Sequence, residues 1–531
     1  MSDTPVFPRA AVAAPNRHAA RAGQAVLAEG GNAVEAMIAM AATIAVVYPH
    51  MNAIGGDGFW LVREPGGKVH AIEACGPAGR DATIRRYRDK GYETIPPRGP
   101  DAAVTVAGAI GGWTVAKALA AALGGKMPLS ELLGDAIGHA RNGYAVSPSE
   151  GRTVPFAEEA LRQAPGFAET FMEEGGRPKA GSIRKMPALA ATLDHLAAAG
   201  LDDFYRGDVG REIAADLARI GAPVTRADLE AFSARTVKPL SLGLPGATVY
   251  NFPPPTQGLA SLMILGIFER LGVRDGESFE HVHGLVEATK RAFRVRDAVI
   301  TDPAELDHDM ASFLDPQRLD REAQAVSMSR AAQFPLAWGE GDTIWMGAID
   351  AKGVAVSYIQ SIYWEYGSGC VLPRTGIHWQ NRGVSFSLDA KARNPLIPGR
   401  KPFHTLNPAL AAFDDGRVMS YGSMGGDGQP QFQAAIFTRH ARFGMGIAEA
   451  IDAPRWLLGK TWGDSATALK FENRADPDLI RAMERAGHAV VVVDAGYDDG
   501  FGHAGMLVRA PRDGSVAAAH DPRSDGGSEG L

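Results

Sequence analysis

Thr343 stands where the sequence offers its most suggestive chemistry. It follows the Gly- and Asp-containing stretch GEGD and opens the apolar run TIWMGAI. A Thr hydroxyl is a weak nucleophile until a base lies beside it, and a Thr at a new chain N-terminus can use its own amine as that base. Cleavage between Asp342 and Thr343 would create that amine. By pattern alone, a Thr at a strand edge without a catalytic function is the commoner situation.

A second candidate is the glycine pair Gly425-Gly426, which follows the strand-like run VMSYGSM. Backbone N–H groups without a neighbouring side chain can point at an oxygen that gains negative charge during amide cleavage. The alternative is a glycine turn that closes a β-hairpin. Taken alone, the glycines favour that alternative.

The surrounding pattern predicts the elements that must position these residues. Up to about residue 332 the chain is mainly helical. HAARAGQAVLAEGGNAVEAMIAMAATIAVV indicates two helices broken at Gly30-Gly31, a third helix is expected to stop at Gly143, and Thr225 with Asp228 caps another. TIWMGAID–AKG–VAVSYIQS predicts strand, turn, strand, and strands dominate from there to Leu531. Helices first and strand pairs later favour sheets stacked face to face with helices outside.

Composition excludes several classes of protein. The net charge is −7 and no Lys/Arg block occurs, so we expect neither nucleic acid nor membrane as partner. The runs RRYRDK (85–90) and KRAFRVRD (290–297) are interpreted as solvated helix faces. Two cysteines argue against a disulfide framework and a Cys-based zinc site. No signal peptide or membrane span is recognised, so a cytoplasmic protein is expected.

Other chemistry-bearing residues favour structural roles. His281 and His283 are two residues apart, so on the helix predicted there they face different sides, and neither they nor DHD (307–309) indicate a metal site. Cys370 has no basic neighbour in sequence and is expected to be buried and inert. GGDG (55–58) is interpreted as a tight turn, since no Lys-Ser/Thr follows it.

Motifs spread along the chain resemble the gamma-glutamyltransferase family of N-terminal nucleophile hydrolases. Their order and spacing match nearly end to end, so chance similarity of single motifs is not a serious rival. The matching stretches are GGNAVEA (30–36), VVYPHMNAIGGDGFWLV (46–62), ARNGYAVS (140–147), FYRGDVGREIA (204–214), PPPTQG (253–258), GDTIWMGAIDAKGVAVS (341–357), GSMGG (422–426), DAPRW (452–456) and DPRSDG (521–526).

The resemblance implies a four-layer αββα sandwich of two stacked sheets flanked by helices, an α+β fold. It implies self-cleavage between Asp342 and Thr343 into a large fragment, 1–342, and a small fragment, 343–531. The two fragments would stay associated as a heterodimer, with further dimerisation left open. Thr343 would be the nucleophile, Ser361 the hydroxyl residue near it, and Gly425 and Gly426 the oxyanion donors. No cofactor or metal is implied.

The positions that hold the substrate depart from the family pattern. Glu73 stands where the family has an Arg, and Tyr363 where it has an Asn. Arg382 and Ser385 replace groups that bind the substrate's α-amino group, and a Ser pair is replaced by His404-Thr405. A guanidinium binds a carboxylate and repels an ammonium, so a small substrate with a carboxylate and no ammonium fits better than a γ-glutamyl group. Glu73 could instead pair with Arg382 or face solvent.

One branch of the family resembles this chain more closely. SIYWEYGSGCVLPRTGIHWQNRGVSFSLD, KPFHTLNPA, YGSMGGDGQPQ and APRWLLGKTWG are similar to amidohydrolases that act on oxamate in purine breakdown. The resemblance implies a self-processing amidohydrolase that converts oxamate to oxalate and ammonia through an acyl-enzyme on Thr343. Two alternatives stay open: a gamma-glutamyltransferase or glutathione hydrolase with altered contacts, and a non-catalytic scaffold of the same fold.

Overall fold

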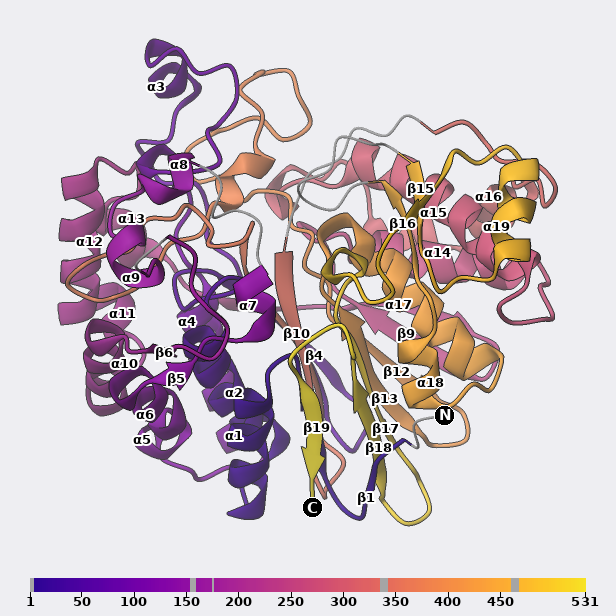
Figure 1. Cartoon of the computed structure of the whole chain (residues 1–531), viewed down its shortest axis with the longest axis horizontal. Coiled ribbons are helices and arrows are strands. Elements are labelled where there is room, and N and C mark those ends of the chain that lie inside the picture. Colours follow the sequence, from indigo (N-terminus) through magenta and orange to yellow (C-terminus); the bar gives the residue numbers. More distant parts are fainter. Residues whose placement is uncertain (1–3, 153–158, 174–175, 335–341, 460–467) are drawn as a thin grey trace.

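The chain folds into four layers, with two β-sheets stacked face to face between two layers of helices (Figure 1). The computed structural model describes residues 4–152, 159–173, 176–334, 342–459 and 468–531. The αββα sandwich implied by the family resemblance is confirmed.

Both central sheets have seven strands. In order across the first sheet these are β19 (Gly527–Gly530), β2 (Ala11–Ala14), β10 (Asp342–Ile349), β11 (Ala355–Tyr363), β3 (Asp57–Arg63), β4 (Val69–Ala74) and β7 (Arg235–Val237). The second sheet has the order β1 (Val6–Phe7), β18 (Val516–His520), β17 (Ala504–Arg509), β13 (Val418–Ser423), β12 (Ala409–Phe413), β9 (Ala247–Asn251) and β8 (Leu240–Leu244). All neighbouring strands within both sheets are antiparallel.

Helices from the first half of the chain cover the outer face of the first sheet, and later helices cover the second (Figure 1). The first group is α1 (Arg17–Ala28), α2 (Ala33–Val47), α4 (Ala109–Ala122), α5 (Leu129–Leu132), α6 (Gly134–Asn142), α10 (Pro187–Ala199), α11 (Asp203–Arg206), α12 (Asp208–Ile220) and α13 (Arg226–Ala231). The second is α14 (Gly258–Arg270), α15 (Phe279–Val299), α16 (Pro316–Gln324), α17 (Gln429–Phe437), α18 (Ile447–Asp452) and α19 (Pro477–Arg485).

Smaller elements complete the chain. They are the helices α3 (Ile84–Asp89), α7 (Pro148–Arg152), α8 (Glu159–Arg162) and α9 (Phe167–Phe171), the hairpin β5 (Tyr144–Ala145) with β6 (Ile183–Arg184), and a third sheet of β14 (Trp456–Gly459), β15 (Ala468–Glu472) and β16 (Val490–Val493).

Three apolar layers hold the sandwich together. One lies between the first helix layer and its sheet, one between the two sheets, and one between the second sheet and its helices. Helix α2 is buried along its whole length, which explains why its sequence lacks a polar face. Trp345, Phe59 and Leu410 belong to the layer between the sheets, so strand β10 is fixed from its inner face.

Several helices begin or end at the residues that local sequence signals predicted. Asn32 caps α2 in a reciprocal capping box with Glu35, and Thr225 does the same for α13 with Asp228. Gly143 follows α6 with φ +105°, a conformation that side chains with a Cβ rarely adopt. None of the helices among the described residues is long and apolar enough to cross a lipid bilayer.

Candidate active site

Strand β10 places Thr343 near the centre of the molecule. The strand lies between β2 and β11, and its register with β11 shifts between Asp342 and Ile344, so Thr343 lies at an irregularity in the ladder. Such bulges re-aim side chains beside active sites. Thr343 is fully buried, and the Gln429 amide nitrogen donates to its Oγ1 at 3.3 Å. Since Gln429 begins α17 behind the second sheet, the Thr343 hydroxyl faces the space between the sheets.

Ser361 and Asp57 continue a polar row from Thr343 across the first sheet. Ser361 in β11 pairs directly with Asp57 in β3. The neighbouring Gln360 points to the helix side, where it donates to Asn52 Oδ1 at 2.8 Å, so alternation along the strand directs Ser361 inward. The Ser361 hydroxyl accepts a hydrogen bond of 2.7 Å from the Tyr363 amide. Ser361 is therefore brought beside the Thr343 strand on the same face.

Gly425 and Gly426 lie where β13 leads into α17. Both have left-handed backbones, with φ +117° and +52°. Among the residues that the structure describes, no acceptor receives a hydrogen bond from either amide, whereas Gln257 donates to the Gly426 carbonyl at 2.9 Å. The hairpin turn favoured by the sequence pattern is wrong here, because the glycines connect a strand to a helix. Two buried N–H groups at the start of α17 can hold an oxyanion.

Arg382 is buried, and no carboxylate among the described residues forms an ion pair with it. It lies in the short 3-10 helix η5 (Arg382–Ser385), where Ser385 ends the same turn. The guanidinium stacks on Tyr363 at 3.8 Å and donates from Nη1 to Thr405 Oγ1 at 3.4 Å, while Nε and Nη2 have no hydrogen-bond partner among the described residues. Burial lowers the pKa of Arg382 to about 10, so it stays charged at neutral pH. Tyr363 pairs with Asp342 across the ladder, which places Arg382 near the Asp342–Thr343 bond.

Asp57 and His404 form a second buried polar group with unused atoms. Asp57 Oδ1 accepts from the amides of Gly108 at 3.0 Å and Gly76 at 3.3 Å, but Oδ2 lies 3.6 Å from His404 Nε2 without a hydrogen bond. Burial raises the pKa of Asp57 to about 7, opposed by the nearby Arg382 charge. Burial holds the His404 pKa well below its usual value, so the imidazole is neutral.

Asp57 is a residue that sequence reasoning missed. The GGDG stretch was interpreted only as a turn, and the structure places its Asp at the first residue of a buried strand. An acidic residue followed by the apolar run GFWLV was the signal, because a carboxylate at the start of a buried strand needs a reason to be there. His404 and Thr405 were predicted, and the structure brings both beside Arg382.

Glu73 is already bound by two cations. Its carboxylate is paired with Arg235 at 2.9 Å and with Lys401, and its side chain is buried. Both alternatives from the sequence, a pair with Arg382 and exposure to solvent, are wrong. A carboxylate already held by two cations has little left to offer a substrate.

The interpretation of residues 290–297 as a solvated helix face is also wrong in part. Lys290 and Arg296 are 3% and 4% exposed. Arg296 donates to Gln257 Oε1 at 2.9 Å and to Asp427 Oδ1 at 2.7 Å, and Gln257 in turn donates to the carbonyls of Thr405 and Gly426. This buried network fixes the loop that carries Gly425 and Gly426.

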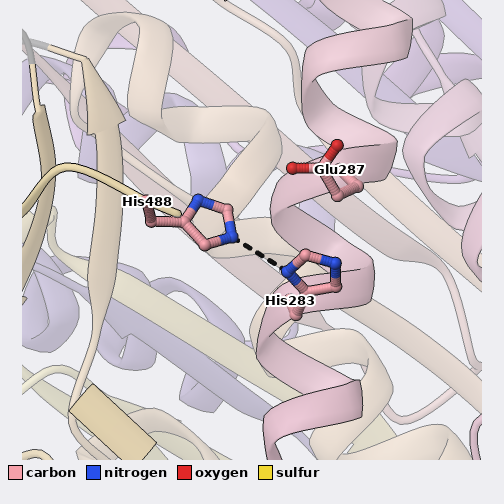
Figure 2. Close-up of side chains that lie close together, drawn as sticks. All are labelled: His283, Glu287 and His488. Carbon is pink, nitrogen blue, oxygen red and sulfur yellow. Dashed lines mark hydrogen bonds between the residues drawn. The ribbon is translucent and has the colours of Figure 1, made fainter. Parts of the chain in front are cut away.

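His283, Glu287 and His488 lie close enough together to raise the question of a metal ion (Figure 2). His283 Nδ1 and His488 Nε2 share a hydrogen bond of 2.9 Å, and His283 Nε2 donates to the Ser327 carbonyl at 2.8 Å. The Lys290 ammonium donates to Glu287 Oε1 at 2.6 Å. Because a cation already neutralises this carboxylate, we assign no ion to the cluster. His281, on another side of α15, contacts Thr438 at 2.9 Å, as the two-residue spacing predicted.

Cys370 is buried, and burial raises the pKa of its thiol to about 12. A thiol in this state is inert at neutral pH, as predicted from the sequence.

Two stacked antiparallel sheets enclosed by helices, with a buried Thr near the start of a central strand, define an N-terminal nucleophile hydrolase. The structure of cephalosporin acylase from Bacillus halodurans matches over 100% of this chain and 97% of its own, with a TM-score of 0.90 and 31% identity. The oxamate amidohydrolase proenzyme of Klebsiella pneumoniae is 50% identical over 519 residues, 98% of both proteins. The glutathione hydrolase-like YwrD proenzyme of Bacillus subtilis is 37% identical over 98% of both.

The gamma-glutamyltranspeptidase family model matches residues 19–531. The chain belongs to this family, and it is a self-processing amide hydrolase.

Proposed function

We propose that the chain cleaves itself between Asp342 and Thr343, and that Thr343 then hydrolyses a small amide bearing a carboxylate, with oxamate as substrate. The observation that carries the substrate class is Arg382, a buried guanidinium with two nitrogen atoms that have no hydrogen-bond partner among the described residues. A buried charge without a counterion is costly in the empty protein and is repaid when an anion binds. Similarity to the Klebsiella oxamate amidohydrolase proenzyme supports the same choice.

In turnover, the Thr343 amine would accept the proton of Oγ1 as that oxygen attacks the amide carbon. Gln429 already donates to Oγ1 and fixes its direction. The amides of Gly425 and Gly426 would stabilise the oxyanion. Ammonia leaves with the transferred proton, and water then hydrolyses the acyl-enzyme to release the diacid. In these reaction steps, residues of the chain itself carry out every proton transfer.

The placement of Arg382 against Tyr363, the ladder partner of Asp342, favours a small substrate. In oxamate the carboxylate and the amide carbon are directly bonded, so a carboxylate on Arg382 leaves the amide close to the strand that carries Thr343. Holding both groups at once supplies near-attack geometry. The Asp57 Oδ2 atom and the unprotonated ring nitrogen of His404, which have no hydrogen-bond partner among the described residues, are available to accept from the amide N–H groups.

One observation favours the second candidate, a glutathione hydrolase. The sequence offered only Glu73 as an acid beside Arg382, whereas Asp57 is a buried acid whose charge interacts with Arg382 and would be available to a substrate ammonium. A γ-glutamyl substrate would place its ammonium at Asp57 and its carboxylate at Arg382. The similarity to the Bacillus glutathione hydrolase-like proenzyme is in line with this candidate.

Intact mass spectrometry of the purified wild type and Thr343→Ala, followed by activity assays, tests both parts. We expect two fragments from the wild type, 1–342 and 343–531, and one uncut, inactive chain from the variant. Oxamate should give ammonia and oxalate, whereas glutathione, glutamine and a γ-glutamyl anilide should not be hydrolysed. An uncut wild type that still hydrolyses amides would refute the role of Thr343, and release from the γ-glutamyl anilide alone would select the second candidate.

A further inference from the structure

Side chains on one face of helix α15 bind the main chain that leads toward Thr343. His283, Glu287, Lys290 and Arg294 follow one another at helical spacing, and all four side chains contact residues 327–334. Figure 2 shows the first two beside His488. We call Glu287, Lys290 and Arg294 the α15 clamp, and residues 327–334 the approach segment.

The clamp binds backbone atoms. Glu287 Oε2 accepts from the Ala332 amide at 3.2 Å, and Lys290 Nζ donates to the Ala332 carbonyl at 2.8 Å. Arg294 Nη2 donates to the Gln333 carbonyl at 2.7 Å and lies over the Phe334 ring at 5.7 Å. Charged groups form strong hydrogen bonds to neutral partners, and bonds to the main chain fix its path whatever the side chains are.

The electrostatics show that the clamp is more than a surface ion pair. Glu287 and Lys290 are 2% and 3% exposed, and they lie 2.6 Å apart. Burying such a pair costs desolvation free energy that an apolar pair would avoid. Here each member also uses its charge on the same residue, Ala332, one at its amide and one at its carbonyl. The pair therefore binds both the backbone N–H and the backbone carbonyl of Ala332.

Both ends of the stretch that leads to the Asp342–Thr343 bond are therefore fixed. On the N-terminal side the clamp ends at Phe334. On the C-terminal side Asp342 is held in the ladder opposite Tyr363. Residues 335–341 join the two and lie outside the described residues.

We propose that the α15 clamp is a positioning device for self-cleavage, which tethers the approach segment so that the Asp342 carbonyl meets the Thr343 hydroxyl. This inference rests on the proposed cleavage at Asp342–Thr343. In that step the Thr343 Oγ–C ester bond forms and the Asp342–Thr343 C–N bond breaks, while the hydroxyl proton passes to the Thr343 nitrogen. Water then hydrolyses the ester, leaving a carboxylate on Asp342 and a free amine and hydroxyl on Thr343.

The reason for a tether is entropic. An intramolecular attack gains its rate from the fraction of time that the reacting atoms spend in near-attack geometry. The ladder holds Asp342 from its C-terminal side only, so a loose approach segment would leave its carbonyl less firmly aligned. Within the described part of the chain, no hydrogen bond or ion pair joins the clamp to Thr343 or Arg382, so its loss should slow maturation and leave turnover by matured enzyme unchanged.

The experiment follows maturation in cell-free synthesis, with the uncut chain and its two fragments quantified over time on denaturing gels and by intact mass. Arg294→Gln removes the Gln333 contact at an exposed position and threatens folding least. The double change Glu287→Leu with Lys290→Met removes the other contacts without leaving an orphaned buried charge. Lys290→Arg keeps a cation for the Ala332 carbonyl and serves as the rescue variant.

Arg291→Gln is the matched control. Arg291 lies on the same helix as the clamp, and the variant removes its 2.6 Å ion pair with Glu322 in α16. The contacts of the approach segment are unchanged.

We expect Arg294→Gln and the double variant to mature about tenfold more slowly or worse, with Lys290→Arg and Arg291→Gln close to wild type. The matured fraction of each should keep the wild-type kcat/KM. Wild-type maturation rates in both clamp variants would overturn the inference. So would slow maturation accompanied by equal losses in kcat/KM and thermal stability, since that result indicates a general structural role. A wild type that never cleaves would instead refute the proposed function.

Discussion

Two buried arginines flank the region around Thr405, and their surroundings differ in kind. Arg296 is paired with Asp427 and Gln257 in a closed network that supports the Gly426 loop. Arg382 has one contact to Thr405 and a stacked Tyr363, with two nitrogen atoms unpartnered. The pKa of Arg296 is raised by Asp427 against the effect of burial, whereas burial lowers that of Arg382. The closed network supports the Gly426 loop, whereas in the proposed function the Arg382 guanidinium binds the substrate carboxylate.

The sharpest test of this contrast is Arg296→Met. It leaves Asp427 buried without its cation and removes the donor that orients Gln257. Loss of one partner of a buried pair costs roughly 3–5 kcal/mol, so a large fall in the free energy of unfolding and loss of activity are expected. Denaturant unfolding measures it. A stable, active Arg296→Met variant would show that the closed network does not support the site.

The next largest effect is expected from Gly425→Ala. At φ +117° a Cβ is strained, and it would lie 2.7 Å from the Phe432 ring. The displaced amide can no longer meet the oxyanion, so kcat should fall by roughly 100- to 1000-fold. Gly399→Ala is the control, because it has a similar φ of +81° in open space. If both variants lose activity equally, the effect is backbone strain alone.

Arg382→Met should act on substrate binding without harming the fold. Removing a charge-assisted contact to a substrate carboxylate should lower kcat/KM by roughly 10- to 100-fold. Because Arg382 has no carboxylate partner to orphan, thermal stability should be unchanged or higher, and self-cleavage should proceed. Steady-state kinetics and a melting curve measure both. A melting temperature that falls as far as that of Arg296→Met would erase the distinction between the two arginines.

Asp57→Asn should give the smallest effect, visible only as a change in pH dependence. With its pKa raised to about 7, Asp57 is neutral below that pH and negative above it. The negative form competes with a substrate carboxylate for Arg382, so the wild-type kcat/KM should fall relative to Asp57→Asn as pH rises from about 6 to 8. A ratio of the two enzymes cancels the titration of the Thr343 amine. A constant ratio would exclude this coupling.

The sequence predicted those features that depend on neighbouring residues. Capping pairs such as Thr225 with Asp228 act within one turn, and the strands around Thr343 follow from apolar runs. The family motifs supplied the αββα fold and a set of candidate site residues.

What escaped prediction depends on partners far along the chain. Lys290 and Arg296 occur at spacing typical of a solvated face, and their burial depends in part on Ala332 and Asp427, which lie far from them in the sequence. The ion pairs of Glu73 are likewise formed with the distant residues Arg235 and Lys401. Asp57 was overlooked because glycines on both sides favoured a turn.

The interleaving of the strands has a consequence for the cleaved protein. Small-fragment strands β10 and β11 lie between β2 and β3 of the large fragment, and the large fragment also supplies both ends of the second sheet. The two pieces share hydrogen-bonded ladders and cannot part without unfolding. Dilution should therefore cause neither dissociation nor exchange of pieces between molecules, and the melting temperature should not depend on protein concentration. The cleaved protein would therefore unfold as one cooperative unit despite the break in its main chain.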